Sequence, residues 1–389
     1  MKKILSLILV AIMICAILVW FSSCYSPGSG GLVYTEVEGG YQVTGVSLKN
    51  RLFTTTVVIP STYKNKPVVS ISDYAFSGYT ALSSLYIADS VKSIGKGAFA
   101  GCVLLDSVEL PASLTHIGDY AFAECYYLNT VIFPESLIYI GKYAFNKCYE
   151  IKEVNIPDSV TNIDEFSFYE CYGLNSVVIG NSVKVIGDGA FAECHELTDV
   201  TIGNSVESIN YAAFGRCVKL ADIQIPDSVI TIGDSAFESC ESLESIVIPN
   251  SVTSIGNAAF NMCESLKSVT LSESITKISN SLFSNCYELS SITIPKSVNS
   301  IETWAFKGCD SLTNITIPNS VTNIGKHAFL GCNMLTSVYI PSSVENIGQC
   351  AFAGSDLLTI YCEVESQPIE WHTEWKTDEI LVVWGCVNH

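Results

Sequence analysis

A repeat of 23 residues is the feature that most constrains this chain. Three consecutive copies, beginning at Val229, Val252 and Ile275, read VITIGDSAFESCESLESIVIPNS, VTSIGNAAFNMCESLKSVTLSES and ITKISNSLFSNCYELSSITIPKS. Twelve copies run in one register from Val68 to Ser343, and a thirteenth follows. A fixed period of this length is typical of stacked repeats, in which each copy buries its apolar face against the next. We number the positions of each copy from 1 to 23, with Val252 at position 1, and the copies as coils 1 to 13.

Apolar side chains recur at fixed positions of the repeat. Position 4 is Ile, position 12 is usually Cys, position 15 is almost always Leu, and position 9 is Phe in all thirteen coils. This last column comprises Phe76, Phe99, Phe122, Phe145, Phe168, Phe191, Phe214, Phe237, Phe260, Phe283, Phe306, Phe329 and Phe352. A column of one large apolar residue in one register predicts a continuous core along the stack.

Two local patterns alternate within each coil. Positions 17 to 21 alternate between polar and apolar residues, which predicts a short strand with one buried face. Position 5 is usually Gly, or another residue that caps helices, and the apolar residues at 8, 9, 12 and 15 lie on one side of a short helix. Neither element is stable alone, so neighbouring coils must stack. The sequence therefore predicts an α/β solenoid with a parallel sheet on one face and short helical turns on the other.

Both ends of the repeat array carry candidate caps. Residues 32–67 contain two alternating runs around Gly39-Gly40, a hairpin signal, and then the strand half of a coil. The thirteenth coil lacks one residue after Phe352, and we expect Leu357, Ile360 and Cys362 at positions 15, 18 and 20. The solenoid then covers residues 68–366. Residues 367–389 form a tryptophan-rich C-terminal cap, whose bulky rings can cover the open end.

The first residues resemble an export signal. MKK precedes an apolar run of eighteen residues, and Phe21-Ser22-Ser23 stands before Cys24. Small residues before a cysteine resemble a bacterial lipobox, which assigns residues 1–23 to a signal peptide and Cys24 to lipidation. An ordinary signal peptide cut nearby, or an uncleaved membrane helix, are alternatives. Residues 24–31, rich in Gly and Ser, predict a flexible tether.

The repeat resembles a known family. The pattern V-x-x-I-G-x-x-A-F-x-x-C-x-x-L-x-x-V-x-I-P-x-S over residues 68–366 is similar to the BspA-type leucine-rich repeat. The resemblance implies a right-handed leucine-rich repeat coil. It also implies an exported, surface-exposed bacterial protein, since the family includes surface proteins that bind extracellular matrix proteins or other cells.

Eleven of the sixteen cysteines form the column at position 12: Cys102, Cys125, Cys148, Cys171, Cys194, Cys217, Cys240, Cys263, Cys286, Cys309 and Cys332. An exported protein can use such cysteines as a disulfide framework, but eleven cannot pair completely. The column also lies between Phe and Leu in the core, so we predict stacked free thiols. Tyr79 and Ser355 stand in the column at its two ends, where we expect incomplete burial. A bridge between Cys362 and Cys386 remains open.

Charge and residue placement exclude several function classes. The net charge of −19 disfavours nucleic acid and anionic lipid. His116, His195 and His327 lie on three distant coils, and the serines at position 23 are expected to bond backbone. We therefore predict no catalytic site and no metal or other cofactor.

Aromatic residues gather in the variable columns of coils 3 to 5. Exposed tyrosines are favoured at interfaces, because they bury area with little loss of entropy. We take the following residues as a candidate binding patch: Tyr120, Tyr126, Tyr127, Tyr143, Tyr149, Phe166 and Tyr172. The alternative is that these rings pack over neighbouring coils as side-chain ladders.

These observations predict a non-catalytic, adhesin-like protein of the cell envelope, anchored through Cys24. It would present an extended face to a protein or cell-surface partner. The alternative is a structural spacer or coat protein without a specific partner.

Overall fold

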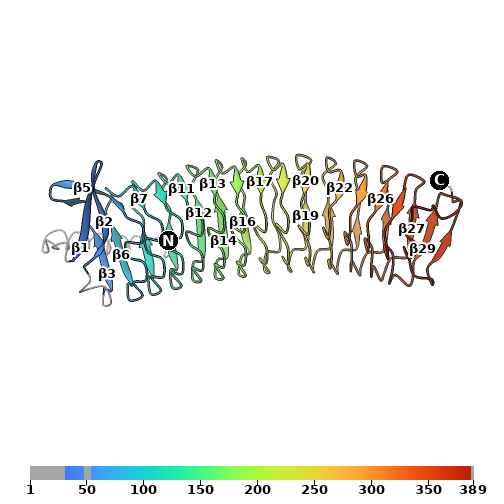
Figure 1. Cartoon of the computed structure of the whole chain (residues 1–389), viewed down its shortest axis with the longest axis horizontal. Helices are drawn as coiled ribbons and strands as arrows, with labels where there is room; N and C mark the ends of the chain where they lie inside the picture. Colours follow the sequence, from blue (N-terminus) through green and yellow to red (C-terminus); the bar gives the residue numbers. More distant parts are fainter. Residues whose placement is uncertain (1–30, 48–53, 387–389) are drawn as a thin grey trace, which may run out of the picture.

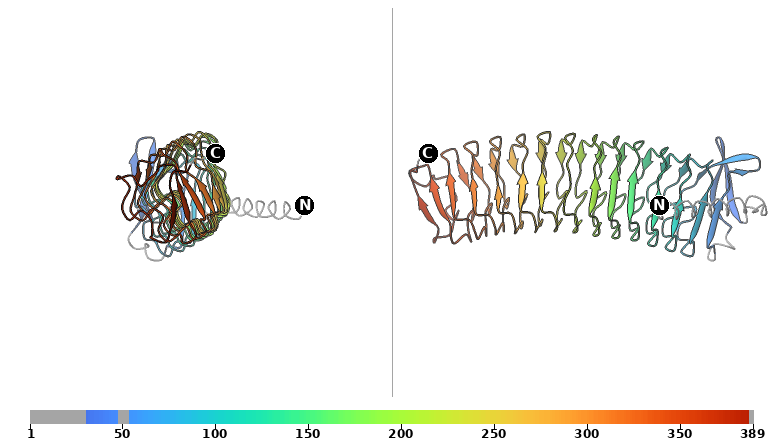
Figure 2. Two further views of the ribbon diagram at one scale, coloured as in Figure 1. Left: turned by 90° about the vertical axis from the view of Figure 1, so that its right-hand side faces the viewer. Right: turned by 180° about the vertical axis from the view of Figure 1, so that it is seen from behind.

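The protein is a long solenoid (Figure 1). The structure, a computed structural model, describes residues 31–47 and 54–386, so the predicted signal peptide and nearly all of the tether, with Cys24, lie outside the described residues. Coils follow one another along a single axis, with the N-terminal hairpin at one end and the C-terminal strands at the other (Figure 2). Within the described ranges, no helix has the length and apolar character needed to cross a membrane.

Strands at positions 17 to 20 form four parallel sheets along one side of the rod. Between regular coils, paired residues are 23 apart, as Val177 and Val200 are, so equivalent residues stack in columns. The spacing is 28 between β3 and β6, and 22 between β27 and β29 and between β29 and β30. The strands are β3 (Thr56–Ile59), β6 (Ser84–Ile87), β8 (Ser107–Glu109), β10 (Thr130–Ile132), β12 (Glu153–Ile156), β14 (Ser176–Ile179), β16 (Asp199–Thr201), β19 (Ser245–Val247), β21 (Ser268–Thr270), β23 (Ser291–Ile292), β25 (Asn314–Thr316), β27 (Ser337–Ile340), β29 (Thr359–Cys362) and β30 (Leu381–Val383).

A second set of parallel strands, which the sequence reasoning missed, occupies positions 3 and 4. Ile at position 4 points into the core, and the polar residue at position 3 points outward. These strands are β5 (Lys66–Ile71), β7 (Ser93–Ile94), β9 (His116–Ile117), β11 (Tyr139–Ile140), β13 (Asn162–Ile163), β15 (Val185–Ile186), β17 (Ser208–Ile209), β18 (Thr231–Ile232), β20 (Ser254–Ile255), β22 (Lys277–Ile278), β24 (Ser300–Ile301), β26 (Asn323–Ile324) and β28 (Asn346–Ile347).

The phenylalanine column forms the centre of the core, as predicted. All thirteen rings are fully buried. Neighbouring rings stack nearly parallel, with centroids from 5.1 Å apart for Phe329 and Phe352 to 5.8 Å for Phe260 and Phe283. Every ring therefore depends on the coils before and after it for its burial, which is the mutual dependence expected of a solenoid.

The predicted helical turns are wrong, because the described residues contain no helix. Positions 5 to 12 form successive turns in which each second N–H bonds three residues back, as Ala121 does to Gly118, Ala123 to Tyr120 and Cys125 to Phe122. The intervening N–H groups bond to the next coil, as Phe122 N does to Ala144 O at 2.8 Å. An α-helix would use these groups internally, and no ladder between coils could then form on this side.

Two columns of left-handed backbone produce these turns. Positions 7 and 11 have positive φ in all thirteen coils, from +48° at Ala212 to +73° at Gly78, Gly331 and Gly354. A positive φ at the third residue of a four-residue turn is the mark of a type II turn. Position 7 is Gly in only two of the thirteen coils and Tyr, Phe, Trp or Ala in seven, so the sequence shows no glycine column. The apolar spacing therefore resembles that of a helix although the backbone is not helical.

Replacing Ala258 with Gly tests this turn conformation, because the turn and a helix predict opposite changes in the free energy of unfolding. Ala258 has φ of +54°, which disfavours a residue with a Cβ. We expect Ala258→Gly to raise the free energy of unfolding by up to about 1 kcal/mol, whereas in a helix it would lower it by about 1 kcal/mol. Denaturant unfolding measures the difference, and Ala259→Gly, next to it at a buried position, should destabilise. A loss of stability in Ala258→Gly would contradict the turn.

The cysteine column consists of free, fully buried thiols, as predicted. Each thiol donates to the carbonyl of the phenylalanine in the preceding coil, for example Cys125 Sγ to Phe99 O at 3.3 Å. Tyr79 and Ser355, at the ends of the column, are also buried, so the expected incomplete burial is wrong. The hydroxyl of Ser355 has no partner among the described residues, which shows that the longer thiol side chain suits this position better.

The buried thiols should make the protein sensitive to alkali. Burial raises the pKa of Cys171 and Cys240 to about 12, from an ordinary value of 9.0. Above about pH 9 the unfolded chain loses thiol protons that the folded chain keeps. Each such thiol then lowers the free energy of unfolding by about 1.4 kcal/mol per pH unit, and contributes nothing to the pH dependence well below pH 9.

We therefore expect stability to be flat near neutral pH and to fall steeply above pH 9, which denaturant melts across this range would measure. In Cys240→Ala the free energy of unfolding should fall less steeply with pH, by the contribution of one thiol, about 1.4 kcal/mol per pH unit. A stability that does not change up to about pH 10.5 would contradict the prediction.

The N-terminal cap contains the predicted hairpin. Strands β1 (Leu32–Val37) and β2 (Gly40–Val46) pair antiparallel. β2 also pairs with β5, so the hairpin extends the sheet formed by the strands at positions 3 and 4. A second hairpin joins β4 (Thr62–Tyr63) to β5 through Lys64 and Asn65, which both have positive φ, as a type I′ turn requires. These elements cover the end of coil 1.

At the C-terminus, tryptophan rings cover the last coil. Trp375 lies edge-on against Phe352, with centroids 5.9 Å apart, and Trp371 donates its Nε1–H to the Val344 carbonyl. The missing residue falls after position 15, so Leu358 is the buried residue and the expected Leu357 is 60% exposed. Cys362 and Cys386 are free thiols.

Candidate functional site

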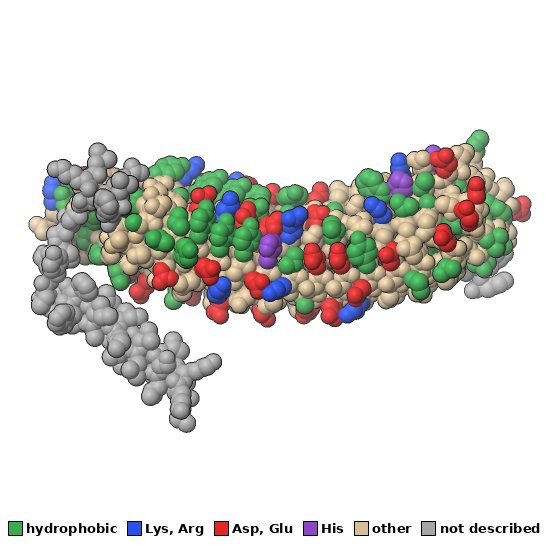
Figure 3. Space-filling view, turned by 90° about the horizontal axis from the view of Figure 1, so that it is seen from below, with side chains coloured by type: hydrophobic (Ala, Val, Ile, Leu, Met, Phe, Trp, Pro, Cys, Tyr) green, Lys and Arg blue, Asp and Glu red, His purple; other side chains and the backbone are tan. Residues whose placement is uncertain are grey.

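Two rows of stacked rings run along the turn side of coils 3 to 6. At position 7, the centroids of Tyr120, Tyr143 and Phe166 are 4.8 and 4.9 Å apart. At position 13, successive distances of 4.9, 4.9 and 4.8 Å join Tyr126, Tyr149, Tyr172 and His195. We call these seven residues the aromatic patch. Figure 3 shows hydrophobic side chains gathered on part of one long face of the rod, with charged side chains among them.

The turn geometry of the coil sets this arrangement. Position 7 has positive φ, and its ring lies against the same position of the next coil. The first row ends at Gly189, where an added Cβ would collide with the ring of Phe166. The rows therefore follow from one backbone shape repeated in every coil, and the residue at each position decides how long a row is.

Stacking covers the faces of the rings and leaves their edges outward. Tyr120, at the end of its row, is 39% exposed, while Tyr143, Tyr149 and Tyr172 are half-buried. A sugar ring or a cation normally binds to an aromatic face, and these faces are already occupied. The patch can instead offer apolar ring edges and hydroxyls, which suits contact with another protein surface.

A column of charges at position 11 lies between the two rows. Its members are Glu124, Lys147, Glu170, Glu193 and Arg216. The Tyr172 hydroxyl donates to Glu170 at 2.8 Å, and His195 Nε2 lies 2.9 Å from a Glu193 carboxylate oxygen. Arg216 bonds the other oxygen of Glu193 at 3.2 Å. The hydrogen bond to Glu170, followed by burial, raises the pKa of the Tyr172 phenol, so the hydroxyl stays protonated and donates.

The structure brings together six of the seven predicted patch residues. Tyr127 lies at position 14, is 56% exposed, and makes no ring contact within the described part of the chain. Sequence reasoning missed His195, which extends the second row, and Tyr169, which packs edge-on against Phe166 at 5.5 Å. His195 could have been found by reading position 13 down the coils, where it follows three tyrosines.

The rings do pack as ladders between coils, which was the alternative reading of the patch. Stacking and binding are compatible here, because the outer edges stay accessible in a row whose shape is already fixed. A row ordered in advance loses little side-chain entropy when a partner covers it. The ladder therefore explains the packing of the rings and leaves the binding function to be proposed.

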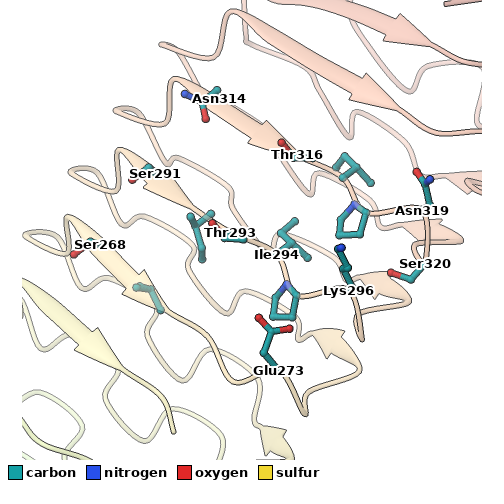
Figure 4. Close-up of a pocket in the computed structure, with 15 residues that line it drawn as sticks. Ser268, Glu273, Ser291, Thr293, Ile294, Lys296, Asn314, Thr316, Asn319 and Ser320 are labelled. Atoms are coloured by element: carbon teal, nitrogen blue, oxygen red, sulfur yellow. The ribbon is translucent and has the colours of Figure 1, made fainter. Parts of the chain in front are cut away.

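A shallow groove crosses the outward face of the strands in coils 9 to 11 (Figure 4). Ser268, Ser291 and Asn314 form one row in it, and Thr293 and Thr316 form the next. These short hydroxyl and amide groups can hydrogen-bond a partner, but the groove lacks the large buried anchors that usually supply binding energy. We therefore treat the aromatic patch as the stronger candidate.

Potential catalytic groups are far apart or bonded to their surroundings. His116, His195 and His327 lie on coils 3, 6 and 12, where they contact Thr115, Glu193 and Trp304. Seven serines at position 23 donate to backbone carbonyls, as Ser113 Oγ does to Val91 O at 2.8 Å. The hydroxyls of Ser90, Ser251 and Ser297 are buried without a partner among the described residues. Among the described residues, no group of three or more His, Cys, Asp or Glu side chains is placed to hold a metal ion.

Comparison with known proteins gives one family model and several solved structures. A model described as a BspA type leucine rich repeat region matches overlapping segments that together cover residues 46–359. A leucine-rich repeat protein from Bacteroides ovatus is 30% identical, with a TM-score of 0.76 over 94% of this chain and 93% of that one.

Two further structures match less closely. A leucine rich cell surface protein from Faecalibacterium prausnitzii is 30% identical, with a TM-score of 0.51 over 81% of this chain and 93% of that one. A leucine-rich repeat protein from Eubacterium ventriosum is 22% identical, with a TM-score of 0.52 over 88% and 95%, and shares the fold. None of the curated proteins matches the chain.

Proposed function

We propose, from the premise that this chain belongs to the BspA-type leucine-rich repeat family, that it is a non-catalytic binding protein of the bacterial cell surface. The Faecalibacterium relative, described as a cell surface protein, supports this location. One observation carries the binding role: the aromatic patch presents seven aromatic side chains that are ordered by stacking into two rows. Its partner is a protein or another cell-surface molecule.

The binding role follows from the physical character of the patch. Tyrosine is enriched among the residues that dominate binding energy, since it combines a large apolar area with a hydroxyl. Stacking between coils holds the rings in place before binding, and the charged column at position 11 can select among partners through electrostatic complementarity.

Removing three rings of the second row tests the binding role. We expect the triple variant Tyr126→Ser, Tyr149→Ser, Tyr172→Ser to weaken saturable binding to immobilised matrix proteins or cells by at least about tenfold, because each lost ring removes buried area. Tyr287→Ser is the matched control, since Tyr287 occupies position 13 of coil 10 and is 41% exposed.

Binding that is unchanged in the triple variant, with an unchanged melting temperature, would refute the role of the patch. Absence of any saturable partner for the native chain would favour a structural spacer instead. The melting control is needed because stacked aromatic pairs contribute about 0.5–1.5 kcal/mol each to stability.

We also propose that lipid attached to Cys24 anchors the protein to the membrane. The apolar run that ends at Phe21, followed by Ser22-Ser23 before Cys24, supports this. Mass spectrometry of the mature N-terminus should find Cys24 as the first residue, carrying two or three acyl chains. A mature chain that begins elsewhere, or an unmodified Cys24, would contradict the anchor.

A further inference from the structure

We propose that the aromatic patch binds a second copy of this chain, with the two rods antiparallel and the turn sides of coils 1 to 9 face to face. The two-fold axis crosses the rods at coil 5, residues 160–182, so coil 4 of one copy faces coil 6 of the other, and coil 3 faces coil 7. The inference names a partner for the proposed binding function and therefore depends on it. Contacts of this kind are self-complementary, because each pair of facing residues occurs twice.

The charged column at position 11 is complementary to itself in this arrangement. Glu124 of one copy faces Arg216 of the other, and Lys147 faces Glu193. Position 6 adds Lys142 facing Asp188, although Lys142 also pairs with Glu165 of its own chain at 2.7 Å. The two-fold axis doubles each pair, which gives six attractive pairs per dimer. A carboxylate at the axis, such as that of Glu170, faces the same carboxylate of the other copy. Glu170 accepts a hydrogen bond from Tyr172, which moderates this repulsion.

Other registers lose this complementarity. Moving the axis to a point between coils 5 and 6 places Lys147 opposite Arg216 and Glu170 opposite Glu193, which are like charges. Moving it to a point between coils 4 and 5 places Glu124 opposite Glu193, which offsets the attraction between Lys147 and Glu170 in that register. A parallel pairing, with the two-fold axis along the rod, brings each charged residue of the column near the same residue of the other copy. Like charges then lie close together. Electrostatics therefore favour one register among those that the 23-residue repeat would otherwise make equivalent.

The shape of position 7 fits the same register. Coils 1 to 5 carry bulky residues at this position, except at Gly97, and coils 6 to 9 carry only Gly, Ala or Ser. In the antiparallel pair Tyr120 faces Ala212, Tyr143 faces Gly189 beside the edge of Phe166, and Tyr74 faces Ala258. Away from the axis, rings on one rod thus meet small residues on the other, in both directions. At the axis, Phe166 faces Phe166 of the other copy.

Matching periodicity makes the contact continuous. Both rods repeat at the strand spacing of about 4.8 Å, so a fit at one coil is repeated at the next. The central contact over coils 3 to 7 is then about 24 Å long, which corresponds to the smaller end of stable protein interfaces. We expect a dimer that dissociates in the micromolar range.

Charge reversal tests the register in the full-length solenoid. Sedimentation velocity over a micromolar concentration series should show a reversible dimer for the native chain. Lys147→Glu should raise the dissociation constant at least about tenfold, since two attractive pairs become repulsive. The double variant Lys147→Glu, Glu193→Lys should recover dimerisation, because each new charge then faces its opposite.

Two controls separate this effect from general changes of charge or stability. Lys184→Glu makes the same change of charge at an exposed residue paired with Glu207 beside the short strands, and should leave the dimer intact. Thermal melting must remain cooperative in each variant, because Glu193 also holds Arg216 within its own chain. A loss of dimer in Lys147→Glu that the double variant does not restore would overturn the register.

A cysteine at the two-fold axis tests the symmetry independently. In Glu170→Cys the two new thiols should face each other, and diamide should oxidise them to a disulfide that links two copies. The native chain and Asn285→Cys, at position 11 of coil 10, should not become linked. Linkage that is equally efficient in Asn285→Cys would refute the antiparallel axis.

Failure of the proposed dimer can be distinguished from failure of the proposed binding function. A native chain that stays monomeric throughout the concentration series overturns the self-association. If the tyrosine triple variant still loses adhesion to another protein or cell in that case, the patch remains a binding site and its partner is a different molecule. If neither dimerisation nor adhesion occurs, both proposals fail.

Discussion

Contact between neighbouring coils is the interaction on which the rest of the structure depends. A single coil, except coil 7 with its one strand, has a strand of two to four residues, a second short strand and a set of turns, none of which can persist alone in water. The neighbouring coil stacks on its phenylalanine ring, pairs with its strands within each sheet, and accepts the N–H groups of positions 7, 9 and 11. Stability therefore grows with the number of coils.

This constraint explains the cysteine column as well as the phenylalanine column. Position 12 must be small and apolar, yet one backbone carbonyl in each coil remains able to accept a second hydrogen bond. A thiol satisfies both demands, since it packs as an apolar group and donates weakly to the Phe carbonyl. Serine is the nearest substitute, and Ser355 is buried without a partner for its hydroxyl.

Features that follow from the periodicity of side chains, such as the longer strands and the core, could be predicted from the sequence. Features that depend on the sign of the backbone angle φ could not. Positions 18 and 20 alternate with polar residues, which identified the longer strands, and Phe at position 9 identified the core. Positive φ at position 7 had no signal, because Tyr120 and Trp304 adopt it as Gly97 does. The patch was found because aromatic residues are conspicuous in variable columns, whereas its ordering into two rows required the turn geometry.

A repeat that fixes the backbone leaves outward positions free to vary, and that freedom is where function can be encoded. Inward columns hardly change over thirteen coils, whereas position 11 changes from Glu124 to Lys147 and back to Glu170 within three. Such variation leaves the phenylalanine and cysteine columns of the core unchanged, so it can specify a partner while the coils stay stacked. A rod of nearly identical units would otherwise bind in many registers at once. The charges at position 11 and the change from rings to small residues at position 7 distinguish the coils from one another. They define one point on the rod for a two-fold axis, which a contact in a single register requires.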